Sequence, residues 1–294
     1  MFTYRKLLLP LFSFNKILIL LLICCSRINT MIPDQIEQIH TFEQLARALE
    51  NVDQNTLVLF DVDYTLWVPE SNICWYLTKD WHRNKHRYPE WLAPILDAAF
   101  KKMSKPELYY KTLWHVKEKP LLINPNIVMV IQAMQNKGVP VFALTMIPTG
   151  SYGIIDHVPE WRFNKLKELG INFRDLRFKD IIFTELTKKD DAYPMFYKGI
   201  LCTAESKGKL LGAFLDRINW KPQHVIFFDD TLSHVENVIQ ELNNRSISCK
   251  GYEYLAAYSM PIELDKKVVE LQFNQLIENE VWLSEQEARL ILEN

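Results

Sequence analysis

The fold is decided by the stretch Leu57-Val58-Leu59-Phe60-Asp61-Val62-Asp63-Tyr64-Thr65-Leu66. Its first four residues are all apolar, and the apolar run ends on an aspartate. A continuous apolar run of this length is typical of a parallel strand that other elements cover on both faces. The stretch therefore predicts a buried parallel strand with two carboxylates just beyond its end.

Two further runs repeat this pattern along the chain. Val141-Phe142-Ala143-Leu144 ends on Thr145, and Val225-Ile226-Phe227-Phe228 ends on Asp229-Asp230. Each run has the length and composition of a strand buried on both faces. The sequence therefore predicts three parallel strands, each followed by a polar side chain.

Helical patterns separate these strands. Apolar residues recur at helical spacing over residues 126–137 and again over residues 207–218. Alternation of strands and helices predicts an α/β fold with a doubly wound parallel sheet. Ligands bind beyond the carboxyl ends of the strands in such a sheet, so we expect Asp61, Thr145 and Asp229 to lie together at that edge.

The composition is that of a globular protein and excludes several classes. The 294 residues are 48% apolar and 24% charged, and 34 basic against 36 acidic side chains give a net charge of −2. This balance argues against a protein that binds nucleic acid. Neither G-x-G-x-x-G nor G-x-x-x-x-G-K-[ST] occurs, so any phosphate chemistry must use a device other than a glycine-rich loop.

Residues 1–26 have the features of a signal peptide or an N-terminal anchor. Arg5 and Lys6 come first, and Ile17 to Cys25 form a nine-residue apolar run, the length of a signal-peptide core. The segment lacks an A-x-A cleavage site, so an uncleaved anchor stays open. It predicts an exported protein, periplasmic or secreted, that associates with a membrane through this segment only.

The D-x-D-x-T-L pattern from Asp61 to Leu66 resembles the first motif of the haloacid dehalogenase-like superfamily of phosphatases. Thr145 is similar to the second motif, and Asp229-Asp230 is similar to the fourth. Lys207 fits the third motif, a lysine at the start of the helix before the fourth; Lys209 fits it less well. The chain also resembles the uncharacterised exported branch of this superfamily found in intracellular bacteria, through Lys207-Gly208, Phe228-Asp229-Asp230 and the export signal.

The resemblance implies hydrolysis of a small phosphomonoester. Asp61 is the expected nucleophile, which would form an aspartyl-phosphate, and Asp63 is the expected general acid and base. Lys207 would supply a fixed positive charge, and the Thr145 hydroxyl would donate a hydrogen bond to a phosphoryl oxygen. Dehalogenation is disfavoured, because that branch has no need of an acid at Asp63.

The expected metal ligands are four carboxylates: Asp61, Asp63, Asp229 and Asp230. Carboxylates crowded at one sheet edge repel one another unless a cation enters among them. A hard divalent cation, which prefers oxygen ligands, would relieve this repulsion, and Mg²⁺ is the preferred candidate. Two other functions remain open: a catalytically weak or inactive binding protein that keeps the metal site, and a phosphotransferase with an acceptor other than water.

Residues 67–124 separate the first two motifs within the expected catalytic domain of residues 27–294. This segment is too long for a simple connection, and it contains predicted helices around residues 91–103 and 106–118. The resemblance implies a mainly helical cap that closes over the site and selects the substrate. Five tryptophans are candidates to face the ligand, although packing in a core is the commoner role. They are Trp67, Trp75, Trp81, Trp91 and Trp114.

The cysteines and histidines give no metal site. His82 and His86 have the spacing of a zinc pair, but basic residues surround them and a charged surface helix is favoured. Cys74, Cys202 and Cys249 form no C-x-x-C pair, and buried free thiols are favoured over a disulfide.

Two later segments are less informative. Residues 146–206 form a second long insertion, expected to hold a helix ended by Gly170 and a hairpin. From Pro261 the chain is expected to be helical, with a capping box from Ser284 to Glu287.

Overall fold

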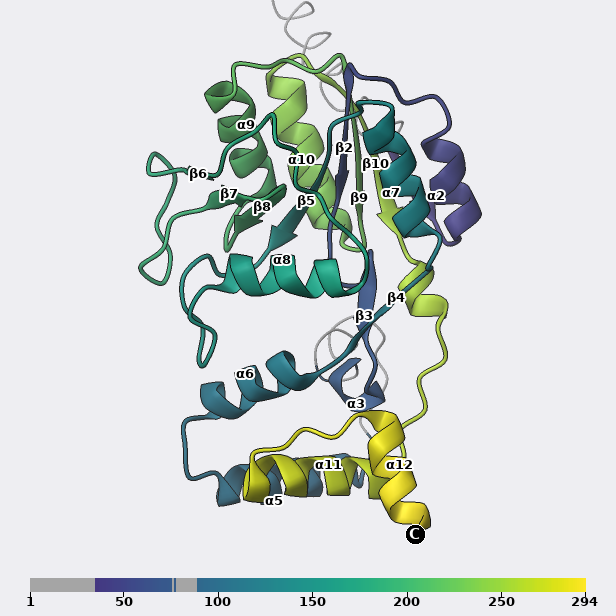
Figure 1. Ribbon diagram of the computed structural model, residues 1–294, viewed down its shortest axis with the longest axis vertical. Coiled ribbons are helices and arrows are strands. Elements are labelled where there is room, and N and C mark those ends of the chain that lie inside the picture. The colour runs from purple at the N-terminus through teal and green to yellow at the C-terminus, as the bar shows by residue number, and fades with distance from the viewer. Residues whose placement is uncertain (1–34, 76, 78–88) are drawn as a thin grey trace, which may run out of the picture.

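The computed structural model describes residues 35–75, 77 and 89–294. Figure 1 shows an α/β core with a smaller helical layer beyond one end of it. The expected signal or anchor of residues 1–26 lies outside the described residues, as do His82 and His86. None of the described helices is long and apolar enough to cross a membrane.

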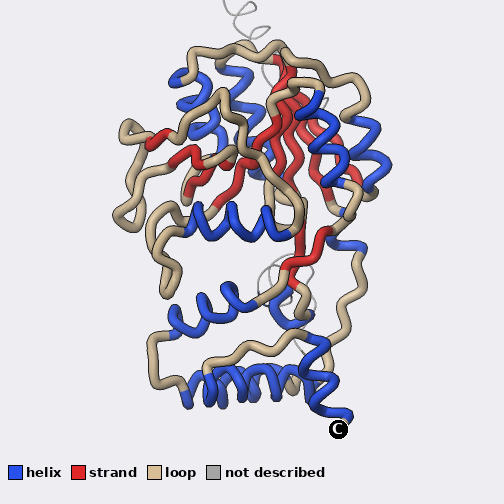
Figure 2. Tube along the Cα trace, viewed as in Figure 1, coloured by secondary structure: helices blue, strands red, loops and turns tan. Residues whose placement is uncertain are grey.

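An eight-stranded sheet forms the centre of the core (Figure 2), in the order β1-β10-β9-β2-β5-β8-β7-β6. In this order, β1, β10, β9, β2, β5 and β8 pair in parallel, each with the next. Strand β7 then pairs antiparallel with β8, and β6 pairs antiparallel with β7 at the edge. The strands are β1 (Ile36–Ile39), β2 (Thr56–Phe60), β5 (Val141–Met146), β6 (Ile181–Ile182), β7 (Met195–Tyr197), β8 (Ile200–Thr203), β9 (His224–Asp229) and β10 (Ser248–Tyr254). The predicted α/β fold with a mainly parallel sheet is confirmed.

Helices cover both faces of the sheet, which explains the continuous apolar runs. Leu57 and Leu59 of β2 pack with one set of helices, and Val58 and Phe60 pack with the other. The first set is α9 (Lys207–Arg217) and α10 (Leu232–Asn244); the second is α2 (Phe42–Ala48), α7 (Ile127–Asn136) and α8 (Val158–Glu168). Every residue of β2 is buried, as a strand with two covered faces requires.

A helical layer is inserted after β2. Strands β3 (Trp67–Pro69) and β4 (Pro120–Leu122) pair antiparallel and form its stem. Between them lie α3 (Asn72–Trp75), α5 (Leu92–Lys102) and α6 (Glu107–Lys117). Two C-terminal helices complete this layer: α11 (Lys266–Asn279) and α12 (Glu285–Glu293). Phe273 of α11 and Trp282 share one buried apolar cluster with Leu113 and Trp114 of α6, so the chain end packs against the insertion.

Several local predictions are also confirmed. The three cysteines in the described residues are buried and free. Strands β7 and β8 form the hairpin expected within residues 146–206. Ser284 caps α12, and Glu287 completes the capping box.

Candidate functional site

Three buried aspartates meet at the carboxyl edge of the sheet. Asp61 follows β2, Asp229 ends β9, and Asp230 comes next in the chain. Since β2 and β9 pair in parallel, their ends lie side by side. One carboxylate oxygen from each aspartate lies within 4.8 Å of the other two, a spacing that could hold a metal ion.

Lys207 is buried among these carboxylates. Its Nζ donates to Oδ1 of Asp61 at 2.6 Å and to Oδ2 of Asp229 at 2.6 Å. Burial acts to lower the pKa of Lys207, but the two carboxylates outweigh it and raise the pKa above the usual range. Burial likewise acts to raise the pKa of Asp229, yet Lys207 and His234 hold it below the usual value. Both groups are therefore charged at neutral pH.

The start of α9 places Lys207 at this edge. Ser206 caps the helix, and its Oγ accepts from the backbone N–H of Lys209. The next residue, Gly208, lies against α10, where its N–H donates to Oδ1 of Asn237 at 2.8 Å. A Cβ at position 208 would lie 2.5 Å from the backbone oxygen of Asn237. The Lys207-Gly208 pair therefore combines a lysine that contacts two of the aspartates with a close helix contact beside it.

Gly208→Ala is expected to destabilise the protein and to weaken the site, because α9 must move away from the backbone of α10. Gly212→Ala is the matched control in the same helix, where the three atoms nearest to an added Cβ belong to the ends of the Glu241 and Arg245 side chains, which can move aside. Both variants gain about 1 kcal/mol of helix propensity. Urea unfolding should show Gly208→Ala at least about 1 kcal/mol less stable than Gly212→Ala. Equal stabilities would contradict a tight contact between Gly208 and the backbone of α10.

Asp230 is oriented by two side chains far away in the sequence. Its backbone N–H donates to Oγ1 of Thr65 at 3.1 Å, and the Tyr258 hydroxyl donates to its Oδ2 at 2.6 Å. Tyr258 lies in a short 3-10 helix (Ala256–Ser259) after β10. Sequence reasoning did not identify Tyr258, because no local pattern distinguishes it from other tyrosines.

Thr145 lies at the same edge, on the other side of β2. Phe60 of β2 and Ala143 of β5 are the last residues that pair between these two strands. Asp61 and Thr145 follow them and therefore lie at the same end of the sheet. The Thr145 hydroxyl is buried and has no hydrogen-bond partner within the described part of the chain. An unpaired buried hydroxyl costs about 1–3 kcal/mol, which a bound acceptor such as a phosphoryl oxygen would recover.

The carboxylate of Asp63 does not join the three aspartates. It accepts from both terminal nitrogens of Arg162, at 2.7 and 2.9 Å, and from the indole nitrogen of Trp67 at 2.7 Å. Arg162 belongs to α8 and is almost fully buried. Three of the four expected metal ligands are therefore together, and the fourth is held in an ion pair with an arginine that sequence reasoning missed.

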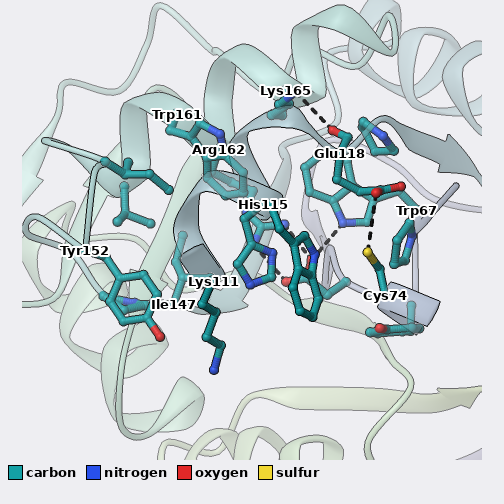
Figure 3. Close-up of a pocket in the computed structure, with 18 residues that line it drawn as sticks. Trp67, Cys74, Lys111, His115, Glu118, Ile147, Tyr152, Trp161, Arg162 and Lys165 are labelled. Atoms are coloured by element: carbon teal, nitrogen blue, oxygen red, sulfur yellow. Dashed lines mark hydrogen bonds and ion pairs between the residues drawn. The ribbon is translucent and has the colours of Figure 1, made fainter. Parts of the chain in front are cut away.

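A pocket of about 370 Å³ opens beside Asp63, between α6, α8 and the β3–β4 stem. In Figure 3, Tyr152 and Ile147 lie at one side of it, and Glu118 contacts Cys74 at the other. Trp67 and Trp114 line the pocket, whereas Trp75 and Trp91 do not. Trp81 lies outside the described residues.

The sheet and the buried acidic triad define an α/β protein with a candidate metal site at the carboxyl edge of its strands. The chain belongs to the family described as Protein of unknown function (DUF2608), whose model matches residues 38–289.

Its relatives in Rickettsia are uncharacterised proteins. The chain is 27% identical to the uncharacterized protein RP296 of Rickettsia prowazekii over 283 residues, 95% of this chain and 98% of that protein. It is 28% identical to an uncharacterized protein of Rickettsia bellii over 207 residues, 68% of each chain. No solved structure shows significant similarity.

Proposed function

We propose that this protein is a Mg²⁺-dependent phosphohydrolase of the haloacid dehalogenase-like superfamily, acting on a small phosphomonoester. The observation that carries the proposal is the convergence of Asp61, Asp229, Asp230 and Lys207 in one buried cluster. Thr145 adds, at the same edge, a buried hydroxyl with no hydrogen-bond partner among the described residues. The motifs that define the resemblance in the sequence are thus neighbours in space.

In the proposed reaction an Asp61 carboxylate oxygen attacks phosphorus, and the bond from phosphorus to the leaving oxygen breaks. Asp63 protonates that oxygen, which departs as an alcohol. A water molecule then attacks phosphorus and gives its proton to Asp63, releasing inorganic phosphate and restoring Asp61. Lys207 and Thr145 would stabilise the negative charge on the phosphoryl oxygens.

The ion pair with Arg162 adds a requirement to this scheme. A guanidinium fork favours the ionised form of Asp63, whereas protonation of the leaving oxygen needs the carboxylic acid. We therefore expect one Asp63 oxygen to leave Arg162 and turn to the leaving oxygen when substrate binds, while the other oxygen keeps the ion pair. If it cannot, the second candidate function gains support, a protein that keeps the fold and binds a metal with little or no catalysis.

The charges of the cluster fit a divalent cation. Three carboxylates and one ammonium leave a formal excess of two negative charges in a buried site. Asp61, Asp229 and Asp230 would hold Mg²⁺, which would neutralise this excess and polarise the phosphoryl group. The Asp63 carboxylate is turned to Arg162 and would not contribute a ligand in this arrangement.

Mg²⁺ is expected to raise the melting temperature and to be required for turnover of a phosphomonoester panel. A ligand at a hundred times its Kd stabilises a protein by about 2.7 kcal/mol, which is about 5–10 °C for a chain of this size. Asp230→Asn should remove most of both effects. The matched control is Asp97→Asn, an exposed aspartate of α5. Metal-independent turnover, or no shift at millimolar Mg²⁺, would contradict the proposed site.

We also propose that the protein is exported through its N-terminal segment. Arg5 and Lys6 before the apolar run of Ile17 to Cys25 favour an N-terminus held in the cytoplasm. A fusion of residues 1–40 to a reporter that is active only after export should be active; retention of that reporter in the cytoplasm would contradict export.

A further inference from the structure

We propose that the leaving group of the substrate is aromatic and occupies the pocket beside Asp63. This inference rests on the proposed phosphohydrolase function and names the class of phosphomonoester that the site accepts: an aryl or arylalkyl phosphate. Sugar and polyol phosphates would be poor substrates.

The walls of the pocket are built largely from rings. Six ring side chains line it: Tyr64, Trp67, Trp114, His115, Tyr152 and Trp161. They come from the segment after β2, the helical insertion and the region around α8, so core and insertion both contribute. Rings favour stacked or edge-to-face contacts with another aromatic group, beyond the gain from burying apolar area. A volume of about 370 Å³ is at the lower end for ligand pockets, which suits one or two rings.

Apart from Lys111, the charged groups in these walls are already paired. Arg162 forms its two-pronged ion pair with Asp63. The Glu118 carboxylate accepts from Ser71, Cys74 and Trp282. Lys165 donates to the backbone oxygen of Glu118. A ligand rich in hydroxyls would therefore lose its hydrogen bonds to water on entering and would find few replacements.

The remaining polar groups do not change this conclusion. Burial lowers the pKa of His115 to about 4, so its ring is neutral at physiological pH. Nε of Arg162 and Nε1 of Trp161 lack hydrogen-bond partners within the described residues, and both atoms are buried within the wall. Lys111 is exposed and lies at the rim. The interior therefore offers mainly apolar contact to a ligand.

The position of the pocket assigns it to the leaving group rather than to the phosphate. Asp63, the proposed acid, lines the pocket, whereas Asp61, Lys207 and Thr145 do not. A phosphoryl group held by those three residues would direct its ester oxygen towards Asp63. The organic part of the substrate would then extend into the pocket.

The first arm of the test compares two alkyl phosphates, so that the reactivity of an aryl leaving group does not bias the result. The full-length protein with Mg²⁺ should hydrolyse 2-naphthylmethyl phosphate with a kcat/KM at least tenfold above that for glycerol 3-phosphate, about 1.4 kcal/mol. Tyr152→Ala should reduce this ratio at least threefold. Tyr193→Ala, which removes a ring outside the pocket, should leave the ratio unchanged.

The second arm measures binding without turnover. 2-Naphthylmethanol, the leaving alcohol itself, should quench tryptophan fluorescence of the full-length protein in a saturable manner, and Tyr152→Ala should weaken its binding. Equal kcat/KM values for the two phosphates, or no saturable binding of the alcohol, would overturn the aromatic assignment even in an active phosphatase. Saturable binding without turnover of any phosphomonoester would support the aromatic pocket and overturn the proposed hydrolysis.

Discussion

Asp61→Asn is expected to lower phosphomonoester turnover by at least about a thousandfold, because an amide cannot replace the carboxylate that attacks phosphorus. The variant should remain folded. The substitution removes one negative charge from a cluster that carries an excess of two, so its melting temperature without Mg²⁺ should equal or exceed that of the wild type.

The matched control for this loss is again Asp97→Asn, the same chemical change at an exposed position. Initial rates and melting temperatures of both variants should be measured side by side. A folded Asp61→Asn protein with near wild-type turnover would rule out covalent catalysis at this position.

Lys207→Met is expected to destabilise the protein by about 3–5 kcal/mol at neutral pH, because it leaves buried carboxylates without their counter-charge. Lys207 is 1% exposed and contacts both Asp61 and Asp229. Lys209→Met is the matched control, since Lys209 lies in the same helical turn but is exposed. Urea unfolding should show little change for the control. A loss below about 1 kcal/mol for Lys207→Met would contradict a charged lysine at the centre of the site.

The pH dependence of this variant follows from the pKa of Asp229. In the folded wild type the pKa of Asp229 lies below its value in the unfolded chain. Ionised Asp229 therefore stabilises the folded protein at pH values above the unfolded pKa. This stabilisation is lost as the pH falls through the folded pKa. Without Lys207, burial should raise the pKa of Asp229 instead. The stability difference between wild type and Lys207→Met should therefore be largest near pH 7 and should narrow towards about pH 4.

Local sequence patterns predicted the elements that build the site. The continuous apolar runs before Asp61 and Asp229 are required by a strand that helices cover on both faces, and such runs are visible in one sequence. Parallel strands then bring their carboxyl ends to one edge, which is why strand order and apolar runs suffice to predict that Asp61, Thr145 and Asp229 share that edge.

The contacts that tune the site were not predictable, because they join segments far apart in the chain. Arg162 reaches Asp63 across 99 positions, and Tyr258 reaches Asp230 across 28. Arg162 and Tyr258 each lie in a helix whose sequence pattern indicates which residues are buried but not which side chain they contact. The packing of the C-terminal helix α11 against the inserted helices was missed for the same reason.

The central claim, covalent catalysis at Asp61, is tested most directly by mass spectrometry of the protein quenched in acid during turnover with Mg²⁺ and a phosphomonoester. The account predicts a phosphoryl group on the peptide that contains Asp61, present in the wild type and absent from Asp61→Asn. Turnover without any phosphorylated peptide, or with the phosphoryl group on another residue, would contradict it.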